Sequence, residues 1–197
     1  MINITKMKKI AKADICLWGV EEIDGKQYML VCDGFRVYKD NIHAFDPKVK
    51  TALFERFGFV PEVGKTYRIG NNINEPAELT KAISSLLPKQ EEYEYTYFTN
   101  MLYRTKTTAN KNGETYVFIA TKGLLFINRD YLDVLKDLDK AEVSTSDGSI
   151  YGMSKFTFPD KDLEYYVLPL RFGDKIGANF YNTIDGICKA KVESKGE

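Results

Sequence analysis

Three turn dipeptides, each between segments of strand-like residues, most constrain what this chain can fold into. They are Asp24-Gly25, Asn112-Gly113 and Asp147-Gly148. Asp-Gly and Asn-Gly favour the two-residue turns of β-hairpins because both turn positions accept a positive φ. The regular alternation of strands and helices that a parallel sheet requires is missing. We therefore expect an α+β fold in which antiparallel β-sheets carry a few short helices on one face.

The expected strands lie on either side of these turns or show the period of two that is typical of a half-buried strand. Tyr93, Tyr95 and Tyr97, for example, alternate with polar residues. This tyrosine stripe is either a stacking platform for bases or a core or partner-facing sheet surface. The segments with strand character cover residues 15–23, 27–32, 93–97, 99–107, 114–120, 124–127, 142–146, 150–158 and 163–171.

Four segments have the apolar spacing of short amphipathic helices. The first covers about residues 5–12. The second follows the cap and first-turn proline of Asp46-Pro47 and runs to Gly58. The third is expected at about 76–88 and the fourth at about 129–138. Because such short helices are not stable alone, each must pack on the sheets.

The chain has 197 residues, enough for one large domain or two small ones. The densest run of turn-forming residues, 69–76, is the best candidate for a boundary. We therefore expect a first subdomain over residues 1–72, a second over 73–188, and a polar, flexible tail over 189–197.

Composition excludes several classes of protein. Basic and acidic residues both number 28, so any binding to nucleic acid needs a local basic patch. The three cysteines are widely spaced and odd in number, which argues against a disulfide framework and for a reducing compartment. No apolar run approaches the roughly 18 residues of a membrane span, and residues 1–6 lack the apolar core of a signal peptide. We expect a cytoplasmic protein with no membrane partner.

Signals for catalysis are weak. His43 is the only histidine, and no cysteine pair has the spacing of a metal site. Gly64-Lys65-Thr66 resembles the end of a phosphate-binding loop, but Gly58 stands one position too far away for that motif. Glu62 also places negative charge where a phosphate would lie. We expect no catalytic residue, no metal and no cofactor.

The first two expected helices carry a local basic patch. It consists of Lys6, Lys8, Lys9, Lys12, Lys48 and Lys50. Such a face can neutralise DNA phosphates without reading sequence. The same pattern is typical of a solvated helix face, and the fourth expected helix is acidic. The residues alone leave both interpretations open.

Four segments resemble parts of the bacterial DNA sliding clamps. Residues 19–37 resemble the clamp hairpin in which a short DGK turn leads to a strand ending in a sequence like ATDGHRLA. Residues 165–172, YYVLPLRF, resemble the closing strand YVVMPMRL. Residues 124–138 are similar to the strand that leads into the second clamp helix, and residues 2–10 to the start of a clamp domain. The resemblance implies a DNA-clamp-like fold.

In sliding clamps, the hairpin end and the closing strand line an apolar pocket that captures short linear peptides of polymerases and clamp loaders. The resemblance implies one wall from Asp33, Gly34, Phe35, Arg36 and Val37, and another from Val167, Leu168, Pro169, Leu170 and Arg171. It also implies that the basic helices face double-stranded DNA, bound without sequence preference. Because clamp rings contain six domains, two domains per chain imply a homo-trimer.

These observations favour a non-enzymatic, clamp-like accessory protein of DNA replication, a processivity factor that binds partner peptides and DNA. A protein-interaction module with the same fold and no role on DNA is the alternative, favoured by the balanced charge and the acidic fourth helix. An enzyme on an α+β scaffold would need a deep pocket that holds a carboxylate with a displaced pKa.

Overall fold

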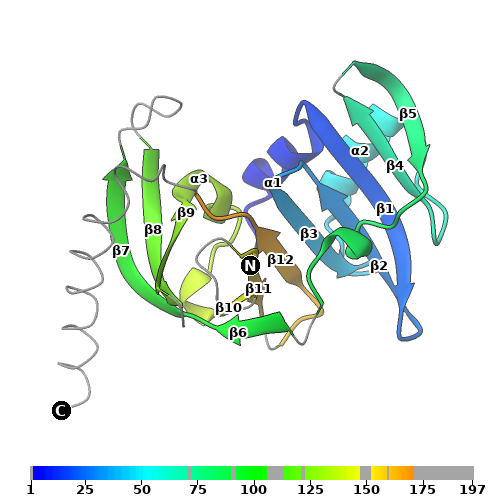
Figure 1. Ribbon diagram of the computed structural model, residues 1–197. Helices are drawn as coiled ribbons and strands as arrows, with labels where there is room; N and C mark the ends of the chain where they lie inside the picture. The colour runs from blue at the N-terminus through cyan, green and yellow to red at the C-terminus, as the bar shows by residue number, and fades with distance from the viewer. Residues whose placement is uncertain are drawn as a thin grey trace, which may run out of the picture.

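A computed structural model describes residues 2–70, 72–89, 92–105, 113–120, 123–146, 152–158 and 160–170, with only the backbone described for 97–105 and 113. These residues form an α+β fold with antiparallel strands throughout both sheets (Figure 1). The larger sheet has the strand order β5-β4-β1-β2-β3-β12-β11-β10-β6, and the smaller has the order β7-β8-β9. The expected fold class is confirmed.

The strands that build the two sheets are short, with the longest in the first hairpin and in β7. Their bounds are β1 Ile15–Ile23, β2 Lys26–Cys32, β3 Arg36–Asn41, β4 Thr66–Gly70, β5 Ile73–Leu79, β6 Tyr93–Tyr95, β7 Tyr97–Thr105, β8 Gly113–Ala120, β9 Gly123–Asn128, β10 Glu142–Ser146, β11 Ser154–Thr157 and β12 Glu164–Val167. The helices are α1 Ile4–Ala11, α2 Pro47–Phe57 and α3 Arg129–Leu132, with short 3₁₀ turns at Ser84–Leu86 (η1) and Leu138–Lys140 (η3).

One supersecondary order occurs twice in the chain. A helix followed by three antiparallel strands is formed first by α1-β1-β2-β3 and again by α3-β10-β11-β12. The last strands of the two units, β3 and β12, pair antiparallel with Tyr38 opposite Tyr165. The two units therefore meet edge to edge inside the large sheet, as Figure 1 shows for the blue and orange-brown strands.

The first hairpin has the predicted turn. Ile23 pairs with Lys26, and the two residues between them, Asp24 and Gly25, have φ values of 51° and 72°. Positive φ at both positions is the geometry that Asp-Gly favours in a two-residue hairpin. The turns predicted at 112–113 and 147–148 include residues outside the described part of the chain.

The two longest helices pack together on one face of the β1–β3 sheet. The α2 helix begins at the predicted cap, where the Asp46 carboxylate accepts the backbone N–H of Lys48 at 2.8 Å, and ends at Gly58 with φ 81°. Arg56 of α2 donates to the carbonyl oxygens of Ala11 and Ala13, at 2.8 and 2.5 Å. Arg56 thereby satisfies carbonyls that the end of α1 leaves without intrahelical partners.

Alternation along β1 gives the sheet two apolar faces. Cys16, Trp18 and Val20 belong to the core under α1 and α2, and the Trp18 ring contacts Phe57 of α2 edge to face at 5.5 Å. Ile15 and Leu17 belong to a second apolar cluster on the opposite face. Because neighbouring residues in a strand point to opposite sides, one strand serves both clusters.

The prediction of a helix at 76–88 is wrong. Pro76 lies in β5, an edge strand of the large sheet that pairs only with β4, and only η1 has helical turns in this stretch. Proline lacks the N–H that an inner strand must donate, so an edge strand accommodates it. The apolar spacing of residues 79–87 reflects packing against the second apolar cluster, to which Leu79, Ile83 and Leu87 belong.

The fourth expected helix starts where predicted but is much shorter. Asn128 caps it by accepting the N–H of Asp130 at 2.9 Å, and α3 ends at Leu132. Beyond it, the carbonyl of Val134 accepts the N–H of Asn3 at 2.8 Å, and Leu135 forms a β-bridge with Ile2. Pairing with the start of the chain therefore replaces further helical turns.

The boundary expected near residue 72 lies in the turn between β4 and β5, and strands from both sides of it belong to the large sheet. The division into subdomains 1–72 and 73–188 stays a prediction. The tail expected at 189–197 lies outside the described residues.

Candidate functional site

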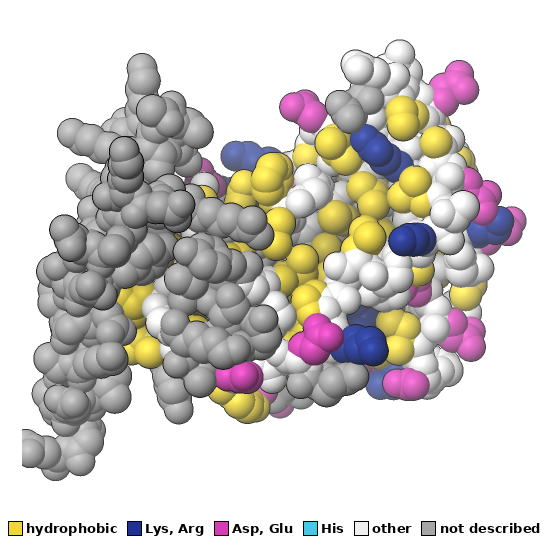
Figure 2. Space-filling view, viewed as in Figure 1, with side chains coloured by type: hydrophobic (Ala, Val, Ile, Leu, Met, Phe, Trp, Pro, Cys, Tyr) yellow, Lys and Arg dark blue, Asp and Glu magenta, His cyan; other side chains and the backbone are white. Residues whose placement is uncertain are grey.

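An apolar groove lies on the face of the β1–β3 sheet that is opposite α1 and α2. Its volume is about 420 Å³. Figure 2 shows apolar side chains gathered over β1–β3 in the centre of the view. The groove is lined by Ile15, Leu17, Cys32, Gly34, Phe35, Arg36, Val37, Arg68, Leu79, Leu86, Leu87 and Met153. Strands β1 to β5, η1 and the residue just before β11 therefore all contribute to it.

One wall of the groove is a tight turn organised by a buried carboxylate. Asp33 accepts the backbone N–H groups of Phe35 and Arg36 through Oδ1, at 3.0 and 2.8 Å. Its Oδ2 accepts Arg36 Nε at 2.8 Å and forms a second bond to the same guanidinium. Gly34 supplies the positive φ of 87° that the turn needs. Four hydrogen bonds to one carboxylate fix the shape of this wall.

The same turn is held against α3 by an aromatic contact. The rings of Phe35 and Tyr131 stack with their centroids 6.1 Å apart, and the guanidinium carbon of Arg36 lies 4.8 Å from the Tyr131 ring centroid. Phe35 is nevertheless 57% exposed. Its exposed part stands at the rim of the groove, where a ligand can reach it.

The opposite wall is the segment from β5 to η1. It is fixed by Ile83, which is fully buried, and by the N–H of Ser84, which the buried carboxylate of Glu21 accepts at 3.1 Å. Leu86, three residues beyond Ile83, lines the groove and is 53% exposed. The groove thus has firmly held walls and exposed apolar side chains at its rim, an arrangement that favours burial of an apolar ligand.

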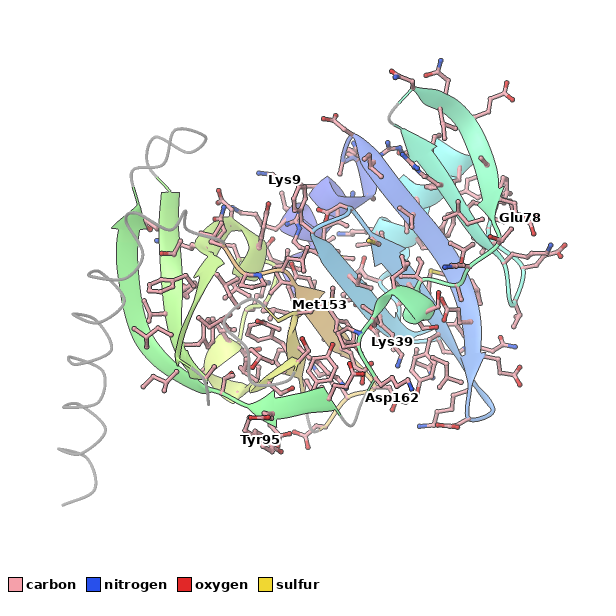
Figure 3. All side chains as sticks on the ribbon, viewed as in Figure 1. Lys9, Lys39, Glu78, Tyr95, Met153 and Asp162 are labelled. Atoms are coloured by element: carbon pink, nitrogen blue, oxygen red, sulfur yellow. The ribbon has the colours of Figure 1, made fainter. Side chains whose placement is uncertain are left out.

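A partly buried ion cluster joins β3, β11 and β12. Glu164 accepts hydrogen bonds from Lys39, Lys155 and the Tyr166 hydroxyl, each at 2.7 Å. Burial acts to raise the pKa of Glu164, but the bonds from Lys155 and Lys39 outweigh it and hold the pKa at about 2. Figure 3 labels Lys39 at this junction. Two lysines thus share one carboxylate, which ties β3, β11 and β12 together.

The two segments expected to form a peptide pocket lie side by side. Val167 pairs with Arg36 in the β3–β12 ladder, and the N–H of Leu168 donates to the Phe35 carbonyl at 2.9 Å. Gly34, Phe35, Arg36 and Val37 line the groove, next to Asp33.

Four of the five residues expected to form the second wall do not line this groove. Among the described residues that line the groove, none comes from Val167, Leu168, Pro169 or Leu170. Val167 is fully buried in the core under the helices, and the Leu170 N–H donates to the Phe126 carbonyl at 2.8 Å. Their place is taken by β1, β4, β5 and η1. Arg171 lies outside the described residues.

The six lysines of the expected basic patch differ in whether they form ion pairs. Lys6 binds Asp133 at 3.2 Å and lies 3.8 Å from Asp130, so its charge is matched within the protein. Within the described part of the chain, the other five lysines form no ion pair; they are Lys8, Lys9, Lys12, Lys48 and Lys50. They lie on or beside the packed helices α1 and α2, where Figure 3 labels Lys9.

The described residues contain no cluster of three or more histidine, cysteine or acidic side chains that could hold a metal ion. None of the helices in this part of the chain is long and apolar enough to cross a membrane.

Comparison with solved structures finds DNA polymerase III β subunits, each with a TM-score of 0.42. A putative β subunit from Eubacterium rectale is 10% identical over 87% of this chain and 65% of its own. The Borrelia burgdorferi subunit, in complex with a natural product, is 11% identical over 88% and 64%. The Pseudomonas aeruginosa sliding clamp, with ligand, is 14% identical over 87% and 65%.

The chain is a divergent structural match to DNA sliding clamps. It spans about 65% of the length of these clamps. No family model matches the sequence, and no curated protein matches it.

Several residues of the groove are not predicted by the sequence. Ile15 and Leu17 could have been found, because they alternate with the core residues of β1. Leu79, Leu86 and Leu87 lie in the stretch expected to form the helix at 76–88, which does not form. Arg68 lies in β4 and Met153 just before β11, both far in sequence from the Asp33–Arg36 turn, and only the order of strands in the sheet brings Arg68 to the groove.

Proposed function

We propose that this chain is a non-enzymatic, clamp-like accessory protein of DNA replication that binds a linear peptide of a partner protein in the groove. The observation that carries the proposal is the apolar groove itself, with Phe35 and Leu86 half exposed at its rim. The wall at Asp33–Arg36 belongs to the segment whose sequence resembles the peptide-binding hairpin of sliding clamps.

The energetics of such a groove suit short peptides. Burial of one leucine or phenylalanine side chain contributes about 1.5–3 kcal/mol, and two such anchors offset much of the entropy lost on binding. The fixed walls reduce the cost of ordering the protein.

The test uses an array of twelve-residue peptides that carry leucine and phenylalanine anchors at varied spacing on a polar background. The tightest binders are then titrated in solution by fluorescence anisotropy. Leu86→Asp places a charge at the rim of the groove and should reduce affinity at least tenfold. Val60→Asp is the matched control, because Val60 is also exposed (39%) but does not line the groove. Absence of binding across the array, or equal binding by both variants, would overturn the proposal.

A second function, contact with double-stranded DNA, is favoured by the five lysines on and beside α1 and α2. A face of unpaired lysines on two packed helices can neutralise several phosphates. Lys6 does not belong to this face, because acidic residues of the α3 region match its charge. We propose that Lys8, Lys9, Lys12, Lys48 and Lys50 form the DNA-facing surface of a homo-trimeric ring.

The DNA-facing surface is tested with duplex DNA over a series of salt concentrations. Lys9→Glu with Lys12→Glu should weaken binding and lower the salt dependence, whereas Lys81→Glu, an exposed change elsewhere, should not. Light scattering reports whether trimers form, and retention on circular but not linear DNA reports encirclement. Absence of duplex binding at low salt would leave a protein-interaction module without a role on DNA.

A further inference from the structure

Arg68 is a cation in the groove for which the described residues supply no partner. It lies in β4 opposite Leu17 of β1 and lines the groove together with Leu17 and Leu79. Its Nε atom lies below the solvent-accessible surface and has no hydrogen-bond partner. No ion pair or side-chain hydrogen bond within the described part of the chain uses its guanidinium. A buried donor without a partner is uncommon, since it loses its bonds to water and gains none.

The acidic side chains described near the groove bind other groups and do not neutralise the charge of Arg68. Arg36, the other arginine of the lining, is paired with Asp33. Glu78, the neighbour of the β5 residue that faces Arg68, pairs with Lys65. The buried carboxylate of Glu21 is used by the Ser84 N–H. Among the described residues, the groove therefore carries one unmatched positive charge beside apolar side chains.

We infer that Arg68 binds the carboxylate of an aspartate or glutamate side chain in the bound peptide. The inference rests on the proposed function and specifies the class of peptide: an acidic residue adjacent to apolar anchors. The guanidinium presents N–H donors in a fork that a carboxylate matches with two parallel bonds. Leu17 and Leu79 exclude water on binding and strengthen this contact.

A side-chain carboxylate fits the position of Arg68 better than the end of a peptide chain does. The Nε of Arg68 lies below the surface, whereas Phe35 and Leu86 stand exposed at the rim. A peptide backbone held between these rim residues can send an acidic side chain down toward the guanidinium. The backbone can then continue past the groove, so the inference applies to internal segments of a partner protein.

The experiment compares matched peptides that differ at one position. The tightest-binding anchor peptides are made in a glutamate and a glutamine version at each position next to an anchor, with amidated C-termini to remove the terminal carboxylate. For one position, the glutamate version should bind the native protein at least tenfold more tightly. Arg68→Gln should abolish this preference while it retains binding of the glutamine version, and Arg68→Lys should keep part of the preference.

The outcomes separate the inference from the function on which it rests. If peptides bind the groove but glutamate and glutamine versions bind equally, or if Arg68→Gln keeps the preference, the inference is wrong and the peptide-binding function stands. If no anchor peptide binds, the proposed function itself fails. Thermal unfolding of Arg68→Gln serves as the control for folding; because Arg68 has no partner, its replacement should not lower the melting temperature.

Discussion

The backbone N–H of Leu168 donates to the carbonyl oxygen of Phe35 at 2.9 Å, one step beyond the last pair of the β3–β12 ladder. This bond joins the two chain segments that resemble the pocket motifs of sliding clamps. It also ties the Asp33–Arg36 turn to the chain just after β12. The wall that a peptide would contact is therefore anchored by the sheet and by its own carboxylate.

Gly34 is required by the backbone of this turn. An added Cβ would meet nothing within 4 Å, so only the φ of 87° opposes a side chain. We expect Gly34→Ala to destabilise the protein by about 1 kcal/mol, since non-glycine residues avoid left-handed φ. Gly34→Asn should lose less, because asparagine tolerates this region better. Urea unfolding measures both, and an alanine variant as stable as the asparagine variant would show that the turn is not strained.

Asp33 is expected to be the most sensitive residue of the groove wall. Asp33→Asn keeps an oxygen for the two backbone N–H groups but leaves the largely buried Arg36 guanidinium without a counter-charge. Removal of one partner from a buried pair costs about 3 kcal/mol. Denaturant unfolding measures this loss.

Glu78→Gln is the control for Asp33→Asn, because it breaks the exposed Lys65–Glu78 pair. Solvent screens exposed pairs, so this change should alter stability little. Equal losses of unfolding free energy in the two variants would mean that burial does not make the Asp33–Arg36 pair more important for stability than an exposed pair.

Sequence patterns of a few neighbouring residues were sufficient to predict the elements whose structure depends on those residues alone. The Asp24-Gly25 hairpin and the capped helix α2 both formed as predicted. The adjacency of the segments around Gly34 and Leu168 came from the resemblance to clamps, since no local pattern links residues so far apart in the chain.

The errors arose where tertiary contacts decide the local structure. The leucines at 79, 86 and 87 have helical spacing, but the pairing of β5 with β4 and the groove determine their conformation. The helix after Asn128 is shortened by pairing of residues 134–135 with the start of the chain. Arg68 could not be predicted as a groove residue from the sequence. Its position depends on which strand pairs with β1, and its proposed role depends on a guanidinium Nε that has no hydrogen-bond partner among the described residues.

Trp18, the only tryptophan, reports on the core between the sheet and α2. It is fully buried and contacts Phe57 edge to face. Phe57→Ala should cost about 3–5 kcal/mol, because it leaves a cavity beside the indole, and should change the tryptophan emission of the folded state. Phe54→Ala is the matched control on the same helix, since Phe54 is 50% exposed. Similar losses from both changes would contradict the packing of α2 described above.

The Glu164 cluster predicts how stability depends on acid. The pKa of Glu164 is about 2 in the folded protein, against an ordinary value of 4.5, so the folded state binds fewer protons between these pH values. Its contribution to stability is therefore complete above about pH 4.5 and is lost as the pH falls toward 2. Glu164→Gln should be less stable than the native protein at pH 7, because it leaves Lys39 and Lys155 without their shared carboxylate.

The measurement is the free energy of unfolding of both proteins between pH 7 and pH 2. The difference between native protein and Glu164→Gln should be constant at neutral pH and should shrink below about pH 4.5. Glu78→Gln, which removes an exposed carboxylate, serves as the control and should follow the native curve closely. A constant difference down to pH 2 would mean that the two lysines do not lower the pKa of Glu164.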